Sequence, residues 1–203
     1  KGCYTLNRGM LTIVIFQYLM KMRLKTALIG GGSGGGKSLI SRMFRSAYIH
    51  SMDNYFRGPF KILDGGIPDW DNPKSVNFDE WIEDYDKICY AITHKTVCKI
   101  ANYNFKTQNI NKIGFNGLKH QVEWIIFEGL FALDKRLHQY SDLKIFVDAP
   151  FSLRVSRRLK RDIKERTSDL KFILMHSYHT EVSYNKFIEP TKKYADLVIP
   201  NYE

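Results

Sequence analysis

Residues 26–38 read TALIGGGSGGGKS and join a short apolar run to a loop rich in glycine. Positions 31–38 match the pattern G-x-x-x-x-G-K-[ST] at every fixed position, and a helical pattern follows them. Glycines here let backbone N–H groups turn inward around a polyphosphate, while the lysine reaches the outer phosphates and the hydroxyl ligates Mg²⁺. The motif predicts that a nucleoside triphosphate contacts Gly31, Gly32, Ser33, Gly34, Gly35, Gly36, Lys37 and Ser38.

Short apolar runs alternate with longer helical stretches along the rest of the chain. We expect strands at residues 26–30, 47–51, 96–104, 122–127, 143–147 and 197–200. We expect helices at residues 36–46, 77–93, 151–166 and 169–188, and a loop around Gly114 and Gly117. This alternation predicts an α/β fold: a P-loop NTPase-type parallel β-sheet flanked by helices. Ligands bind outside the carboxyl ends of such strands, and segments 54–75 and 103–121 would form lobes there.

Composition and charge narrow the class of protein. The 203 residues are 44% apolar and 26% charged, which suits a packed domain and excludes wholesale disorder. Lysine and arginine total 31 against 21 acidic residues, which indicates either an anionic partner (nucleic acid or a phosphorylated small molecule) or a basic surface that only aids solubility. No aromatic–basic nucleic-acid motif accompanies that charge. The three cysteines have no metal-ligand spacing and favour a reducing compartment.

The amino-terminal segment does not fit the fold pattern. Residues 10–20 are mostly apolar, but they are well short of the roughly 20 residues of a membrane span. Lysine and arginine follow them instead of a small-residue cleavage site. We therefore interpret residues 1–22 as a leader of uncertain role and residues 23–203 as a single domain.

Three carboxylates are candidates for the site. Glu128 ends a buried-type strand and can hold Mg²⁺ or one of its waters. Asp53 follows the second strand, where it could act as a general base toward an acceptor hydroxyl or could only shape a turn. Asp71 could likewise accept hydrogen bonds from sugar hydroxyls or start a turn.

The helix expected at residues 151–166 carries a basic stripe. Arg154, Arg157, Arg158 and Arg161 recur at the spacing of one helical face, which suits a lid that clamps phosphates. A solvated basic face is the alternative interpretation. The opposite stripe of Val155, Leu159 and Ile163 is expected to be buried.

Several further segments carry a family resemblance: SMDNYF (51–56), DNP (71–73), YNFKT (103–107), IFEG (126–129), FVD (146–148), RRLKRDIKER (157–166) and PTKKYAD (190–196). Together with the phosphate loop they resemble the uridine kinase (uridine–cytidine kinase) family of P-loop nucleoside kinases, over about residues 24–200. The resemblance implies ATP- and Mg²⁺-dependent phosphorylation of the 5′-hydroxyl of uridine or cytidine. It also implies one kinase domain with a lid helix and a small β insertion over the acceptor site.

The resemblance implies residue roles as well. Asp53 falls on the catalytic base beside the catalytic Lys37, and Asp71 and Arg154 fall on positions that hold the ribose hydroxyls. Tyr103 and Phe105 match aromatics that line the base pocket, and Gln108 stands where the family has a histidine. Arg157 and Arg161 match the lid over ATP, and Ser38 and Glu128 are the expected metal ligands. Family members are typically cytoplasmic tetramers.

Two other interpretations stay open. The run Asp69-Trp70-Asp71 is similar to nicotinamide riboside kinases, so another small hydroxyl compound could be the acceptor. A degenerate kinase that binds ATP as a regulator is the alternative from a different class. No nucleic-acid or membrane partner is expected.

Overall fold

The computed structural model describes residues 24–202 apart from 64–65, 105–106, 108 and 167–169. Its centre is a five-stranded sheet in which every neighbouring pair is parallel, in the order β2-β7-β1-β8-β9. The strands are β1 (Lys25–Gly31), β2 (Ala47–Ser51), β7 (Trp124–Glu128), β8 (Leu143–Asp148) and β9 (Leu197–Pro200). This architecture confirms the expected α/β fold.

Strand β1 shows why the sheet is buried on both faces. Ala27, Leu28 and Ile29 are all fully buried, and successive side chains on a strand point to opposite faces. Leu28 therefore packs in one core cluster with Trp81, while Ala27 and Ile29 pack in another. A continuous apolar run of this kind is what the two-sided burial of a parallel strand requires.

Helices cover the two faces of the sheet. The helix α2 (Lys37–Arg42) covers one face through Ile40, and α3 (Phe78–His94) covers the other through Trp81 and Ile88. The side chain of Asn77 caps α3 by accepting a hydrogen bond from the backbone of Glu80, as the capping pattern predicts. Helix α2 ends earlier than expected, at Arg42, and Phe44 then packs edge-on against Trp124 at 5.5 Å.

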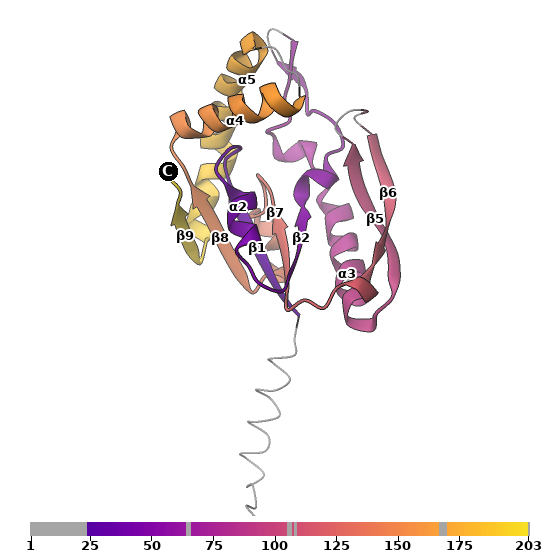
Figure 1. Ribbon diagram of the computed structural model, residues 1–203. Coiled ribbons are helices and arrows are strands. Elements are labelled where there is room, and N and C mark those ends of the chain that lie inside the picture. Colours follow the sequence, from indigo (N-terminus) through magenta and orange to yellow (C-terminus); the bar gives the residue numbers. More distant parts are fainter. Residues whose placement is uncertain (1–23, 64–65, 105–106, 108, 167–169, 203) are drawn as a thin grey trace, which may run out of the picture.

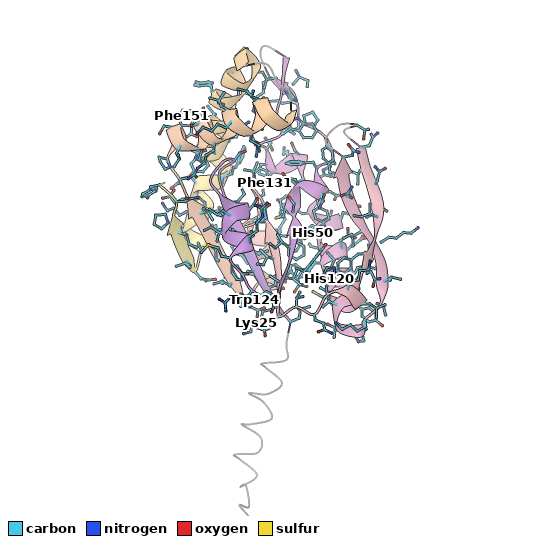
Figure 2. The ribbon with its side chains drawn as sticks, in the orientation of Figure 1. Lys25, His50, His120, Trp124, Phe131 and Phe151 are labelled. Carbon is cyan, nitrogen blue, oxygen red and sulfur yellow. The ribbon has the colours of Figure 1, made fainter. Side chains whose placement is uncertain are left out.

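Helices α4 (Phe151–Arg166) and α5 (Leu170–Ser183) lie above the carboxyl end of the sheet (Figure 1). A π-helical turn, Tyr184–Ile188, and a 3₁₀ segment, Glu189–Tyr194, then lead to β9. Lys25 and Trp124 pair at the amino-terminal edge of the sheet, far from Phe151 at the start of α4 (Figure 2). Helices α4 and α5 therefore cover the opposite edge of the sheet, where the strands have their carboxyl ends.

Two small antiparallel hairpins complete the fold. One pairs β3 (Ile62–Leu63) with β4 (Ile67–Pro68), and the other pairs β5 (Val97–Asn104) with β6 (Asn109–Asn116). The second hairpin flanks α3 (Figure 1). The prediction of a loop around Gly114 is therefore wrong, because residues 109–116 form a strand. The reason is a ladder in which Val97 faces Asn116 and Asn104 faces Asn109.

The strand order places one crevice at the end of β1. From β1 the chain crosses to β2 on the β7 side, and from β7 it crosses to β8 on the other side of β1. A change of direction of this kind opens a crevice between the two loops that diverge there. The glycine-rich loop lies at this point. Within the described residues, no helix combines the length and the apolar character needed to cross a bilayer.

Candidate active site

A cavity of about 530 Å³ lies at this crevice. It is bounded below by the phosphate loop and the carboxyl ends of the strands, and on the other sides by α4, α5, the β3–β4 segment and β5. The lining includes Ser33, Gly34, Gly36, Lys37, Ser38, Asp53, Phe56, Pro68, Trp70, Asp71, Tyr103, Glu128, Arg157, Arg158, Arg161, Asp162 and His176. Residues from distant parts of the chain therefore line the same cavity.

Lys37 and Ser38 end the phosphate-loop motif and are the first two residues of α2. Lys37 Nζ donates to the carbonyl oxygens of Gly31 and Gly32, both at 3.0 Å. Ser38 Oγ donates to Glu128 Oε1 at 3.1 Å. Burial lowers the pKa of Lys37, and the carboxylates of Glu128 and Asp53 oppose that shift. The ammonium group is thus kept next to two carboxylates, where phosphate oxygens could replace the loop carbonyls.

Positive φ angles in this loop require glycine. Gly34 and Gly36 adopt φ values of 77° and 94°. A Cβ at Gly34 would collide with the carbonyl oxygen of Arg154, and one at Gly36 would collide with Nδ2 of Asn201. The loop is therefore packed closely against α4 and against the segment that follows β9.

The two carboxylates of the lower wall come from neighbouring strands. Ser51 pairs with Glu128 in the β2–β7 ladder, and Asp53 follows Ser51 by two residues. The hydroxyl of Ser51 accepts a hydrogen bond from the backbone of Asp53 at 3.2 Å and caps a 3₁₀ turn, Met52–Tyr55. Asp53 and Glu128 both line the cavity, as the sequence predicts.

Helix α4 buries two arginines of its basic stripe, and the solvated basic face that was the alternative interpretation does not describe them. Arg154 is 3% exposed and Arg158 is 8% exposed, whereas Ile163 is 52% exposed. The prediction that Val155, Leu159 and Ile163 form the buried stripe is therefore wrong. The arginine face is buried because it meets polar partners on the phosphate loop and on α5.

Each arginine of α4 has a different environment. Arg157 Nη1 donates to the carbonyl of Gly34 at 3.3 Å, and Arg161 lines the cavity beside Asp162. Arg154 Nη2 donates to Glu181 Oε2 at 2.6 Å, and its guanidinium lies 3.8 Å from the ring centre of Tyr184. Arg154 is not among the residues that line the cavity. Its predicted contact with ribose stays a prediction.

The cavity wall around Asp71 contains a chain of buried polar contacts. Asp71 is 8% exposed, and its Oδ2 accepts a hydrogen bond from Thr180 Oγ1 at 2.7 Å. Arg158 donates to Thr180 Oγ1 at 2.8 Å and to His176 Nδ1 at 3.0 Å. Because a guanidinium can only donate, the His176 ring accepts at Nδ1 and carries its proton on Nε2. Burial, aided by the charge of Arg158, lowers the pKa of His176.

Three aromatic rings form the far wall of the cavity. Tyr103 lies 6.0 Å from Trp70 and 6.1 Å from Phe56 between ring centres, in edge-to-face arrangements. The backbone of Tyr103 donates to the side chain of Asn54 at 3.3 Å, which ties β5 to the segment that carries Asp53. Phe105 and Gln108 lie outside the described residues. An apolar wall with a polar floor suits a flat ring bound through its edge.

Some lining residues were given no individual role from the sequence. Phe56 and Trp70 stand inside or beside the quoted segments SMDNYF and DNP, and Arg158 belongs to the basic stripe, so a signal was present for these three. His176 is one of two histidines in α5, and nothing in its local sequence distinguishes it from His179. Only the packing of α5 over Asp71 brings it to the site.

Comparison with known proteins agrees with this architecture. The sequence model of the "Phosphoribulokinase / Uridine kinase family" matches residues 68–203. The chain is 34% identical over 193 residues to the uridine kinase of Streptococcus agalactiae serotype V, covering 88% of each chain. It is 33% identical to uridine-cytidine kinase A of Dictyostelium discoideum, covering 90% of this chain and 38% of that protein.

Solved structures share the fold at low sequence identity. A possible uridine kinase from Bacillus stearothermophilus superposes with a TM-score of 0.54 at 16% identity, covering 92% of this chain and 96% of that one. Phosphoribulokinase from Rhodobacter spheroides superposes with a TM-score of 0.55 at 12% identity, covering 89% of this chain and 71% of that one. With the phosphate loop, the carboxylates and the sheet order in place, the chain belongs to the phosphoribulokinase/uridine kinase family and is a phosphotransferase.

Proposed function

We propose that the protein transfers the γ-phosphoryl group of ATP, with Mg²⁺, to the 5′-hydroxyl of a pyrimidine ribonucleoside, uridine or cytidine, in pyrimidine salvage. One observation carries the proposal: a single cavity has the phosphate loop on one side and Asp53, Asp71 and Tyr103 on the other. The names of the curated relatives, uridine kinase and uridine-cytidine kinase, support this acceptor class.

The nucleotide half is formed by the phosphate loop and α4. Lys37 would place its charge on the γ-phosphoryl group as negative charge shifts during transfer. Arg157 and Arg161 would close over the phosphates from α4. In these roles the three cations would position the phosphates and stabilise their charge. Positioning and electrostatic stabilisation account for most of the acceleration of phosphoryl transfer by enzymes.

The oxygens of Ser38 and Glu128 fit Mg²⁺. They lie 3.1 Å apart at the edge of the cavity, and hard oxygen donors are what this ion prefers. No group of three or more His, Cys, Asp or Glu side chains that could hold a metal is found within the described part of the chain. The remaining ligands would therefore be phosphate oxygens and water, and the ion would neutralise charge on the phosphates.

The acceptor half would be arranged around Asp53. Its carboxylate would accept the proton of the 5′-hydroxyl, and Asp71 would accept hydrogen bonds from the ribose hydroxyls. Tyr103, Phe105 and Gln108 would contact the base. Arg154 is bonded to Glu181 at 2.6 Å and does not line the cavity, so its contact with the ribose rests on the family resemblance alone.

A second candidate acceptor is nicotinamide riboside. Trp70, which comes from the run that is similar to nicotinamide riboside kinases, lines the cavity beside Tyr103. A regulator that binds ATP without turnover would not need Asp53 in the cavity. By the family resemblance we also propose that the enzyme acts in the cytoplasm as a homotetramer, which sedimentation measurements would test.

The decisive experiment is an ADP-release assay with ATP and Mg²⁺ across uridine, cytidine, adenosine, nicotinamide riboside and no acceptor. We expect both pyrimidine ribosides to stimulate ADP release and adenosine to be excluded by the aromatic wall. Gln108→His serves as the matched variant, because a glutamine amide can donate or accept and should discriminate weakly between uridine and cytidine. Preference for nicotinamide riboside would replace the proposed acceptor, and absence of stimulated release would favour the regulator.

A further inference from the structure

The segment after β9 contacts the phosphate loop through Asn201. Asn201 Nδ2 donates to the carbonyl of Gly35 at 2.9 Å. Its Oδ1 accepts from Nη2 of Arg157 at 3.2 Å. The backbone N–H of Asn201 is in turn bonded to the carbonyl of Asp148 at 2.7 Å, at the end of β8. One amide side chain therefore joins the phosphate loop to α4, from an anchored backbone.

The chemistry of the two partners determines how the amide is oriented. Arg157 offers only donors and the carbonyl of Gly35 only an acceptor, so the amide must present oxygen to the first and nitrogen to the second. A flipped amide would oppose donor to donor and oxygen to oxygen. Arg157 also donates to the carbonyl of Gly34 at 3.3 Å, so the arginine, the amide and the loop form a closed set of contacts.

These contacts set the direction of a loop peptide. In a trans peptide the C=O and the next N–H point to opposite sides. Holding the carbonyl of Gly35 toward Asn201 turns the N–H of Gly36 away from Asn201, and Gly36 lines the cavity. Gly36 cannot carry a side chain here, because its Cβ would collide with Nδ2 of Asn201. The contacts of Asn201 with Gly35 and Arg157 therefore orient the N–H of Gly36, which is a backbone donor of the phosphate loop.

We infer that Asn201 is a positioning residue for the nucleotide, fixing both the phosphate loop at Gly35 and the arginine Arg157 that would close over the phosphates. The inference rests on the proposed use of ATP at this loop. Asn201 does not line the cavity and needs no contact with the nucleotide. Its removal should weaken ATP binding because both binding elements would then have to be ordered at the time of binding.

The test compares Asn201→Ala with the wild type by calorimetric titration with ATP·Mg²⁺ and by steady-state kinetics. We expect the Kd and KM for ATP to rise about tenfold, as loss of one or two net hydrogen bonds predicts. The KM for the nucleoside should change less than about twofold, because the acceptor residues do not contact Asn201. Equal changes in both KM values would indicate general damage to the fold and would overturn the inference.

Two further variants sharpen the result. Tyr202→Phe is the matched control, since Tyr202 belongs to the same segment but its hydroxyl donates to Asp148 Oδ2 at 3.4 Å and not to the phosphate loop. The ATP affinity of this variant should equal that of the wild type. Asn201→Asp keeps an acceptor for Arg157 and loses the donor to Gly35, so its KM for ATP should also rise, which preserves the test if Asn201→Ala does not fold.

A double-mutant cycle tests whether Asn201 and Arg157 act together on ATP affinity. Asn201→Ala and Arg157→Ala should be non-additive in ATP affinity, with the double variant close to the weaker single variant. Full additivity would contradict a shared role. Wild-type protein that binds no ATP would overturn the proposed function together with this inference, whereas normal wild-type binding with an unaffected Asn201→Ala would overturn the inference alone.

Discussion

Thr180 Oγ1 donates a hydrogen bond to Asp71 Oδ2 over 2.7 Å, although the two residues are 109 positions apart in the chain. The same hydroxyl oxygen accepts from Arg158 Nη1 at 2.8 Å. A hydroxyl can fill both roles at once, so Thr180 holds the carboxylate of Asp71 in one orientation at the cavity wall. The position of the Asp71 carboxylate thus depends on α5.

Thr180→Val removes this hydroxyl at nearly constant volume. We expect the KM for uridine to rise about tenfold, equivalent to roughly 1.4 kcal/mol, while the KM for ATP stays near the wild-type value. The preference for uridine over 2′-deoxyuridine should fall as well, since the misplaced carboxylate no longer reads the ribose hydroxyls.

Thr180→Ser is the control for that prediction. It keeps the donor and loses only a methyl group, so it should restore most of the uridine affinity. If the serine variant is as impaired as the valine variant, packing of the methyl group and not the hydrogen bond controls the acceptor site. Initial rates with both nucleosides measure all of these quantities.

Lys37→Ala should abolish turnover. The γ-phosphoryl group would lose the cation beside Glu128 and Asp53, and electrostatic contributions of this kind are worth about 100-fold or more in kcat. Lys99→Ala, at an exposed position of β5, is the matched control and should keep full activity. A folded Lys37→Ala protein with undiminished kcat would contradict the nucleotide half of the site.

Asp53→Asn should separate binding from chemistry. The amide cannot accept the proton of the acceptor hydroxyl, and general-base contributions are about 10²–10⁴-fold in kcat. ATP affinity, measured by titration, should be retained because the phosphate loop is unchanged. Loss of ATP affinity with normal turnover of bound substrate would instead identify Asp53 as a structural or metal-binding residue.

His50 predicts a specific pH dependence of stability. It lies in β2 (Figure 2) and is 4% exposed. Its ring lies between the hydroxyls of Tyr48 at 3.1 Å and Tyr55 at 3.0 Å. Burial lowers its pKa from 6.5 to about 4. Between these values the unfolded chain binds a proton that the folded protein does not bind, so stability is lost as the pH falls from 6.5 to about 4.

The size of this effect follows from the shift. The free energy of unfolding should fall by roughly 3 kcal/mol across that window through His50 alone. Urea unfolding at about pH 5 and about pH 7, compared with His50→Gln, isolates the contribution, because glutamine keeps polar contacts and does not titrate. Identical pH dependence of the two proteins would show that His50 is already protonated or accessible in the folded state.

The parts of the fold with local causes could be predicted from the sequence. The phosphate loop needs glycine at particular dihedral angles, and the start of α3 needs a capping side chain at Asn77. Strand β1 is recognisable because all of its central residues are apolar. The carboxylates Asp53 and Glu128 could be placed together because parallel strands bring their carboxyl ends to one edge.

The parts with distant causes could not be predicted. Strand β6 reads NINKIGFN, a polar segment with a glycine, and it is a strand only because β5 pairs with it. The buried arginine face of α4 depends on Glu181 and Thr180, which are more than twenty residues away. His176 reaches the cavity through the same packing of α5. Local pattern cannot report a partner that tertiary structure supplies.

The central claim is that the cavity transfers phosphate to a nucleoside 5′-hydroxyl, and ³¹P NMR of the reaction products tests it most directly. Wild-type protein with ATP, Mg²⁺ and uridine should produce ADP and uridine 5′-monophosphate in equal amounts. With 5′-deoxyuridine, which lacks the reacting hydroxyl, and with the Asp53→Asn variant, the monophosphate signal should be absent or strongly reduced. A phosphorylated product from 5′-deoxyuridine, or ADP and inorganic phosphate without any nucleotide product from uridine, would contradict the account.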